Sequence, residues 1–256
     1  MIANLKPYAA YKDSGVPWLG EVPAHWEVRR IKTLFRETDE RSGDGGGPLL
    51  SLRRARGIVP QAEASNRIAS VEDLSKYKVC KSGDLIMNRM QAWSGMFAVS
   101  GIDGVISPDY GVFEPKAPID VHCFDALFKT PLLVEEFAKR SKGIGSGFNR
   151  LYTLDFGAVL IASPPLPEQT AIVEYLDAQT AKLDAAMAAA RREIELLREY
   201  RERLIADVVT GKVDVREVAA QLPEETEEET EPLEEETTPT EETDGEKSEE
   251  ETDGEE

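Results

Sequence analysis

The feature that most constrains this chain is residues 167–211, which contain no glycine or proline between Pro167 and Gly211. Proline is suited to the first turn of a helix, and glycine is suited to the position that follows the last turn. The sequence therefore predicts one continuous helix over 167–211. At about 1.5 Å per residue, such a helix is on the order of 65 Å long.

Apolar residues recur along this helix with a seven-residue repeat. When Val173 is given position a, nine of the eleven a and d positions are apolar, and the exceptions are Thr180 and Arg201. A stripe of this length favours pairing with a second helix alongside. The alternative is a helix folded back against its own globular domain. The residues expected to make the pairing face are Val173, Leu176, Leu183, Met187, Ile194, Leu197, Leu204 and Val208.

Composition separates the remaining regions. Residues 1–165 mix short β-rich runs with two or three helical stretches, which predicts one α+β (mixed α/β) domain, followed by the helix (166–211) and a short connector (212–222). Residues 223–256 are mostly Glu, Thr, Pro and Gly, with almost no apolar side chains. Such a segment cannot bury enough surface to fold, so we expect an acidic disordered tail.

Turn signals divide the α+β domain into elements. We expect strands near 49–52, 84–88, 97–99, 112–113 and 159–162, and a helix over 131–142 that ends at Gly143. Residues 96–100 and 105–107 are expected to form a hairpin with Asp103-Gly104 at its turn. A capping box at 70–73 predicts the start of a further short helix.

The net charge of −19 is distributed unevenly. The tail holds 19 acidic residues and one lysine, which leaves 30 acidic and 29 basic residues in 1–222. The part that folds is therefore almost neutral, and its charge does not exclude nucleic acid as a partner. The tail is expected to solvate the chain; the alternative is that it competes with DNA for basic residues.

Two cysteines, Cys80 and Cys123, stand in no CxxC arrangement and are expected to be reduced thiols. The N-terminus has no apolar run suited to a signal peptide, and the sequence has no run of 18 apolar residues. The expected location is the cytoplasm.

Residues for catalysis are scarce. His25 and His122 lack a second His or Cys at metal-ligand spacing, and there is no P-loop. One nuclease-like pattern exists, with Asp109 after Pro108 and then Glu114-x-Lys116, which could suit Mg²⁺ chemistry. Its two acids are separated by only four residues, so a strand that ends at a turn is the favoured interpretation.

Basic and amide residues gather in three places and favour DNA binding, because Arg and Lys contact phosphates while Arg, Asn and Gln can read base edges. The tryptophans Trp18, Trp26 and Trp93 are expected to pack rather than to contact bases. The three candidate clusters are Arg53, Arg54 and Arg56; then Asn88, Arg89 and Gln91 beside Trp93; and then Lys139, Arg140, Lys142, Ser146, Asn149 and Arg150, around the glycine-rich residues 143–147.

Three motifs, in this order along the chain, resemble specificity subunits of type I restriction–modification systems. They are residues 11–26 (YKDSGVPWLGEVPAHW), residues 83–95 (GDLIMNRMQAWSG) followed by 104–110 (GVISPDY), and residues 165–173 (PLPEQTAIV) leading into the long helix.

The resemblance implies a non-catalytic subunit that directs its partners to a split DNA site. In that family two target-recognition domains are held apart by two helices, which dock a methyltransferase subunit and a restriction–translocase subunit. S-adenosylmethionine, ATP and Mg²⁺ are then expected on the partners, with none in this chain.

This sequence departs from the family pattern because it has one recognition domain (1–165) and one helix, about half the family's length. We therefore expect a homodimer with antiparallel helices and a palindromic, interrupted target. The alternative functions are a stand-alone Mg²⁺-dependent nuclease and a coiled-coil scaffold for protein interactions.

Overall fold

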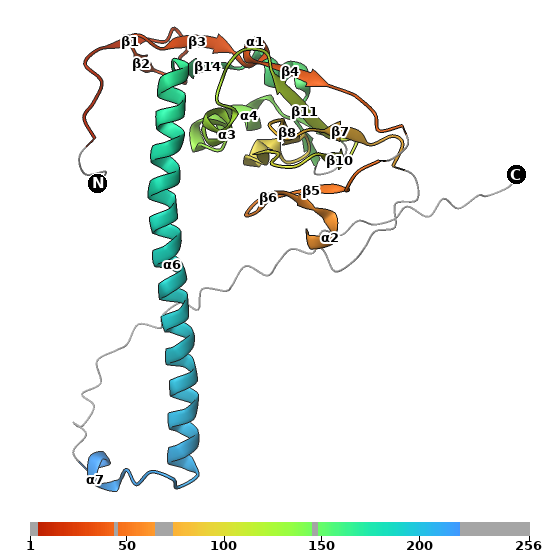
Figure 1. Cartoon of the computed structure of the whole chain (residues 1–256). Helices are drawn as coiled ribbons and strands as arrows, with labels where there is room; N and C mark the ends of the chain where they lie inside the picture. Colours follow the sequence, from red (N-terminus) through yellow and green to blue (C-terminus); the bar gives the residue numbers. More distant parts are fainter. Residues whose placement is uncertain (1–4, 44–45, 65–73, 145–147, 221–256) are drawn as a thin grey trace, which may run out of the picture. The chain divides into compact units, whose positions relative to one another are not determined.

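The computed structural model describes residues 5–43, 46–64, 74–144 and 148–220 (Figure 1). The predicted capping box, Ser146 and the acidic tail lie outside these residues. By their packing the residues form two compact units, Met1–Ala188 and Ala189–Glu256. The fold class is as predicted, a mixed α+β domain followed by a long helix.

The α+β domain is built from short strands joined by turns. The described strands are β1 (Tyr11–Asp13), β2 (Glu21–Pro23), β3 (Glu27–Arg30), β4 (Phe35–Thr38), β5 (Leu50–Arg53), β6 (Gly57–Pro60), β7 (Lys78–Cys80), β8 (Leu85–Asn88), β9 (Phe97–Val99), β10 (Gly104–Ile106), β11 (Tyr110–Pro115), β12 (Lys142–Ile144), β13 (Phe148–Arg150) and β14 (Leu160–Ser163). The predicted runs correspond to β5, β8, β9, β11 and β14.

The helices alternate with these strands. They are α1 (Ile31–Leu34), α2 (Gln61–Ala64), the 3₁₀ turn η1 (Ala92–Ser94), α3 (Val121–Phe128), α4 (Pro131–Arg140), α5 (Thr153–Ala158), α6 (Leu166–Val209) and α7 (Arg216–Ala219). Helix α4 ends two residues earlier than expected, because Lys142 already begins β12.

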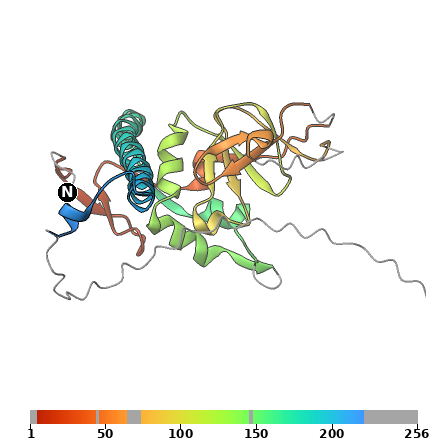
Figure 2. The same ribbon diagram turned by 90° about the horizontal axis from the view of Figure 1, so that it is seen from below.

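A four-stranded antiparallel sheet, in the order β4-β11-β8-β9, forms the centre of the domain. The β5–β6 hairpin lies against β9 and β10 (Figures 1 and 2). Five two-stranded pairings surround the sheet: β1 with β2, β3 with β14, β5 with β6, β7 with β10, and β12 with β13.

Alternate side chains of the central strands enter two separate cores, because successive residues of a strand point to opposite faces. On β8, Leu85 and Met87 join the first core whereas Ile86 joins the second. This is why residues 85–87 read as a continuous apolar run rather than an alternating one. The first core is covered by α3, α4 and α5, and the second by β5, β7 and β10.

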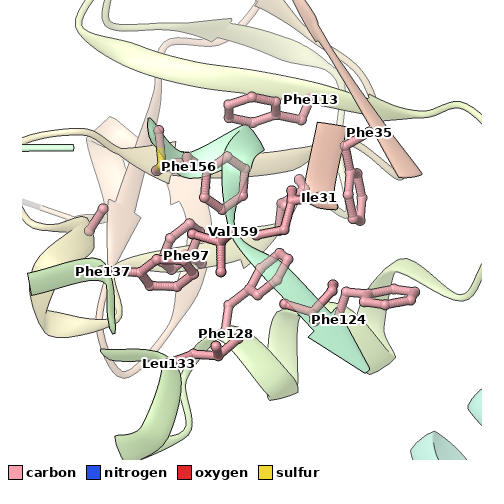
Figure 3. Close-up of a cluster of buried hydrophobic side chains, with 14 of the residues drawn as sticks. Ile31, Phe35, Phe97, Phe113, Phe124, Phe128, Leu133, Phe137, Phe156 and Val159 are labelled. Atoms are coloured by element: carbon pink, nitrogen blue, oxygen red, sulfur yellow. The ribbon is translucent and has the colours of Figure 1, made fainter. Parts of the chain in front are cut away.

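The first core is dominated by phenylalanines (Figure 3). Phe156 of α5 is fully buried, and its ring centroid lies 5.1 Å from that of Phe113 and 5.4 Å from that of Phe128. Phe97 stacks on Phe156 with centroids 5.6 Å apart. These aromatic contacts fix α5, and therefore the chain that precedes it, against the sheet.

The predicted hairpin over residues 96–107 is wrong. Strand β9 pairs with β8, and β10 pairs with β7. Gly104 is required by close packing, since a Cβ at this position would lie 2.5 Å from the carbonyl oxygen of Pro48. The same approach of chains lets the Val105 amide donate to Pro48 at 2.9 Å. The glycine of Asp103-Gly104, which resembles a turn residue in the sequence, is thus required by a tertiary contact with Pro48.

Helix α6 runs from Leu166 to Val209 and matches the predicted helix within two residues at each end. Gly211 follows it in the left-handed region, with φ of 74°. The amide of Lys212 closes the end by donating to the carbonyl of Asp207 at 2.9 Å. Helix α6 therefore stops as glycine-terminated helices commonly do.

The first turn of α6 is fixed by two side chains. Glu168 accepts hydrogen bonds from the Trp26 indole at 2.8 Å and from the Tyr8 hydroxyl at 3.2 Å, and lies 2.5 Å from Nε2 of His25. Gln169 is buried. Its side-chain carboxamide donates to the carbonyl of Pro164 and accepts from the backbone amide of Asp120. These contacts tie the helix start to residues that are distant in sequence.

The electrostatics of Glu168 follow from these contacts. Partial burial raises the pKa of its carboxyl, but the hydrogen bonds from Trp26, His25 and Tyr8 stabilise the carboxylate and outweigh that effect. The pKa of Glu168 therefore lies below its ordinary value.

Trp18 packs against the first core. The two tryptophans near the N-terminus, Trp18 and Trp26, therefore have structural contacts, as expected.

The predicted pairing face of α6 is open. Val173 and Val208 are half-buried, and the other six members, from Leu176 to Leu204, are 39–62% exposed. Gln169 is the one buried residue described in the helix. Leu176, Leu183 and Met187 belong to the same compact unit as the α+β domain and are still exposed, which argues against the folded-back alternative for this part of the helix.

Candidate nucleic-acid interface

The first candidate cluster lies at the turn of the β5–β6 hairpin. Arg53 ends β5, and the turn is closed by the Arg56 amide, which donates to the Arg53 carbonyl at 3.3 Å. Arg56 pairs with Glu63 of α2 at 3.5 Å. The buried Nε of Arg53 has no hydrogen-bond partner among the described residues. The hairpin therefore presents guanidinium groups close together at one end.

The second cluster follows the end of β8. The Asn88 carboxamide accepts from the backbone amide of Met90 at 3.0 Å and donates to the Gln91 side-chain oxygen at 3.2 Å, so the two carboxamides lie together in a local turn. The Trp93 indole donates to the Met90 carbonyl at 2.9 Å, and the side chain is 40% exposed. Trp93 is therefore much less buried than a core tryptophan.

Arg89 is placed differently from the other nominated residues. Its side chain is 15% exposed, and its guanidinium forms an ion pair with Glu37. Glu37 also lies 3.4 Å from the ammonium of Lys78, which is fully buried and lies 3.0 Å from Asp39. The charges of Arg89 and Lys78 are thus compensated by Glu37 and by the exposed Asp39. Arg89 is therefore largely buried and ion-paired, and its contact with DNA stays a prediction.

The third cluster is divided between two elements. Lys139 and Arg140 end α4 and form ion pairs with Glu135 and Glu136, one turn earlier on the same helix. Arg140 also lines a shallow hollow of about 360 Å³ with Trp18 and Arg30. The ion pairs of Lys139 and Arg140 are therefore formed within α4 itself.

The other members of the third cluster lie on the β12–β13 hairpin. Lys142 pairs with Arg150 across the two strands and Gly143 pairs with Asn149, which is exposed. The Lys142 ammonium lies 2.9 Å from Asp155, and the Arg150 guanidinium lies 3.0 Å from Asp109. Ser146 is outside the described residues.

Tertiary contacts join the three clusters. Arg54 donates from its guanidinium to the carbonyl of Ser94 at 3.0 Å and to its hydroxyl at 2.8 Å, which attaches the β5–β6 turn to η1. The Leu151 amide donates to the Arg89 carbonyl at 2.9 Å, which attaches the end of β13 to the end of β8. The β5–β6 turn therefore lies next to η1, and the end of β13 lies next to the end of β8, although these segments are separate in sequence.

Sequence reasoning missed the side chains that surround these cations. Tyr152 has Arg150 and Lys142 within 5.7 and 5.8 Å of its ring centroid. Leu154 is 87% exposed. Asp155, Asp109 and Glu37 each neutralise a nominated cation. The signal in the sequence was the near-zero net charge of residues 1–222, which implies that most cations have an acidic neighbour.

The nuclease pattern does not gather into one site. Asp109 forms its ion pair with Arg150, whereas Glu114 forms one with Arg36 of β4. The Lys116 ammonium donates to the carbonyl of Lys32 at 2.9 Å. The two carboxylates and the lysine thus have three different partners. Pro115 ends β11 opposite Phe35, so a proline is tolerated there.

The remaining candidate groups have structural surroundings. Cys80 and Cys123 are buried free thiols, and desolvation raises the pKa of each to about 11. Among the described residues, no three His, Cys, Asp or Glu side chains are grouped so as to hold a metal ion. No helix in the described part of the chain is both long and apolar enough to cross a membrane.

Comparison with known proteins gives structural similarities only. No protein-family profile and no curated protein matches the chain. One solved structure concerns complex assembly and conformational transition of a type I restriction–modification system; it has a TM-score of 0.49 and 22% identity over 73% of this chain and 46% of that chain.

Two further structures are similar in part. The HsdS subunit from Thermoanaerobacter tengcongensis has a TM-score of 0.43 and 19% identity, over 68% of this chain and 41% of its own. The S subunit of a type I system from M. genitalium has a TM-score of 0.41 and 13% identity, over 72% and 45%. This chain therefore spans less than half the length of each.

Proposed function

We propose that this chain is a DNA-recognition subunit of a type I restriction–modification complex. The observation that supports it most is the proximity of the β5–β6 turn, η1 and the ends of β8 and β13, which carry cation and amide side chains from all three clusters. The Arg54–Ser94 and Leu151–Arg89 hydrogen bonds hold them together. A surface with several Arg, Lys, Asn and Gln side chains suits phosphate contact combined with base reading. The three motifs in family order add to this proposal.

In this proposal the chemistry belongs to partner subunits. An adenine methyltransferase subunit holds S-adenosylmethionine, and a restriction–translocase subunit holds ATP and Mg²⁺, in the cytoplasm. This chain selects the DNA. The alternative of a stand-alone nuclease is disfavoured by the separate ion pairs of Asp109 and Glu114.

The test of DNA recognition is the triple change of Arg53, Arg54 and Arg56 to Ala in the assembled complex. We expect weaker binding to target DNA and a shallower dependence of affinity on salt, because each lost phosphate contact removes about one unit of slope. Unchanged affinity and slope would remove this cluster from the interface. If the unaltered complex retains no DNA but captures protein partners, the coiled-coil scaffold alternative takes its place.

We also propose that the chain forms a homodimer through α6, with the two helices antiparallel. The open a and d face supports pairing, and the e positions support the orientation. With Val173 at position a, the charged e residues are Asp177, Asp184, Arg191 and Arg198, which are all exposed and are acidic in the first half of the helix and basic in the second. Charges flanking the apolar seam commonly set the orientation of paired helices.

The midpoint of α6 lies between residues 187 and 188. In an antiparallel pair the two e columns run along the same side of the seam in opposite directions. Pairing about the midpoint therefore places Asp177 beside Arg198 of the second copy, and Asp184 beside Arg191. In the same register the apolar layers match, with Leu183 against Ile194. A parallel pair offers one such match, Glu193 with Arg198.

A two-fold subunit should read a two-fold target. Sequencing of methylated DNA from cells that carry the complete system tests this directly. We expect a palindrome interrupted by unread bases. An asymmetric split motif would mean that the chain pairs with a different recognition subunit rather than with itself.

A further inference from the structure

An exposed apolar pair, Tyr152 and Leu154, follows the β12–β13 hairpin of the candidate interface. Tyr152 is 42% exposed and Leu154 is 87% exposed, whereas Leu151 and Phe156 on either side of them are fully buried. A single exposed apolar residue is ordinary on a protein surface. Here two lie within three positions, beside residues that the sequence nominated for DNA contact, so their exposure calls for a functional reason.

The surrounding structure holds this pair in place. Phe156 is fixed by its aromatic neighbours (Figure 3), and the Leu151 amide donates to the Arg89 carbonyl at 2.9 Å. The Arg89 guanidinium reaches the Thr153 hydroxyl at 3.5 Å while it is paired with Glu37. Tyr152 and Leu154 are therefore presented by a segment that is anchored at both ends, and little ordering remains to be done on binding.

The charges around the pair are balanced. The cations of Lys142 and Arg150 lie 5.8 and 5.7 Å from the Tyr152 ring centroid, within the range of cation–π attraction. Asp155 and Asp109 neutralise these two cations. Electrostatic attraction to a polyanion is therefore weak here until phosphates replace the two carboxylates, and other contacts must add to the affinity.

We propose that Tyr152 and Leu154 make an apolar contact with double-stranded DNA, against thymine methyl groups or deoxyribose, while Lys142 and Arg150 contact the phosphates on either side. This inference rests on the proposed function and adds the residues and the type of contact. The occupant is DNA because both cations flank the pair and can exchange their carboxylates for phosphates. Apolar side chains are known both to touch the thymine methyl group and to insert at base steps.

The first experiment compares Leu154→Ala with the unaltered chain, in complex with the methyltransferase subunit, on duplex DNA that carries the methylated motif. We expect about a tenfold loss of affinity, as for loss of most of a buried leucine side chain, with the salt slope unchanged. Leu154→Met should retain most of the affinity, because methionine and leucine have similar volumes. Lys142→Ala should instead reduce the salt slope by about one.

Ile102→Ala provides a matched control. Ile102 is an exposed aliphatic residue in the turn after β9, at the end of the sheet where Val99 pairs with Leu85. The candidate interface follows Asn88 at the opposite end of β8. This control should bind DNA like the unaltered chain. Equal losses in the Leu154 and Ile102 variants would overturn the inference.

A second experiment distinguishes the two apolar groups of DNA that the pair could contact, the thymine methyl group and deoxyribose. Replacing thymine by uracil in the target removes only the methyl groups, and affinity should fall for the unaltered chain but not for Leu154→Ala if the contact is to thymine. Equal binding of both duplexes assigns the contact to deoxyribose. If Leu154→Ala binds DNA normally but loses the methyltransferase subunit, the pair is a protein-docking site and the inference is wrong. Absence of sequence-specific binding by the unaltered complex would instead reject the proposed function.

Discussion

The α+β domain and helix α6 use the same kinds of apolar residue in opposite ways. In the domain, Phe124, Phe128, Phe137 and Phe156 are fully buried against one another (Figure 3). In α6, the leucines, methionine and isoleucine of the pairing face remain 39–62% exposed. A domain closes its core with residues from distant parts of its own chain. An isolated helix has no such neighbours, which is why we propose that its stripe pairs with a second helix.

This difference separates two kinds of stability. Substitutions in the phenylalanine core act on the folding of the domain, whatever the state of association. In the proposed dimer, substitutions on the α6 face should act on association and leave the domain intact. The two kinds of substitution should therefore be separable by measuring unfolding and association on the same variants.

The largest effect is expected for Phe156→Ala. Phe156 contacts four other phenylalanines, so the substitution leaves a large cavity and should lower the free energy of unfolding by about 3–5 kcal/mol. Urea unfolding followed by tryptophan fluorescence measures it. Leu154→Ala, two residues away and exposed, should change the same free energy by less than about 0.5 kcal/mol. Similar losses in both variants would contradict the assignment of the core.

The next effect concerns association. Leu183→Asp places a charge in an apolar layer of the proposed seam and should weaken self-association by about 100-fold or more. Analytical ultracentrifugation over a range of concentrations gives the dissociation constant. Leu196→Asp is the matched control, because Leu196 is 65% exposed at position c, away from the seam. A chain that is monomeric before any substitution, or that loses association equally in both variants, would reject the proposed face.

The anchor of α6 should show a pH-dependent effect. Glu168→Gln should lower the free energy of unfolding by about 1 kcal/mol at neutral pH, because a carboxylate accepts stronger hydrogen bonds than an amide. The folded pKa of Glu168 lies below its ordinary value of 4.5, so its contribution is complete above that pH. It is lost as the pH falls through the lower folded pKa.

The difference in the free energy of unfolding between the unaltered chain and Glu168→Gln should therefore shrink on acidification. Urea titrations at several pH values would detect this change. A difference that stays constant from neutral to acidic pH would mean that the carboxylate charge of Glu168 does not matter to the anchor.

The smallest effect tests helix orientation. Arg191→Asp should weaken the dimer about three- to tenfold, since exposed ion pairs contribute only a fraction of a kcal/mol each. Adding Asp184→Arg should restore the affinity, because it re-forms the pair in the antiparallel register. Failure of the double variant to recover, with Leu183→Asp still disruptive, would leave the seam in place but reject its antiparallel register.

The sequence predicted the class of fold and most strands of the central sheet. Its predictions were wrong where segments that are distant in the sequence meet. The Asp103-Gly104 pair has the local chemistry of a hairpin turn. Gly104 instead lies where the chain at Pro48 approaches too closely for any side chain, and no local pattern reveals such an approach. Similarly, Arg89 has the appearance of a surface cation until Glu37, 52 residues away, is placed beside it.

The candidate interface was predicted in pieces. Each cluster was identified from residue type and from closeness along the sequence, which are local features. Their meeting depends on Arg54 with Ser94, 40 residues apart, and on Arg89 with Thr153, 64 residues apart. The roles of Tyr152 and Leu154 could not be predicted, because exposure of an apolar residue is decided by what packs around it.

The sequence by itself determined helix α6, its ends and its apolar stripe, because helical periodicity and the stop at Gly211 are properties of nearby residues. The tertiary structure decided which cations lie side by side, which are neutralised by a carboxylate and which apolar side chains stay exposed. Those outcomes depend on contacts between segments that only folding brings together, where burial and charge compensation act over distance in space rather than along the chain.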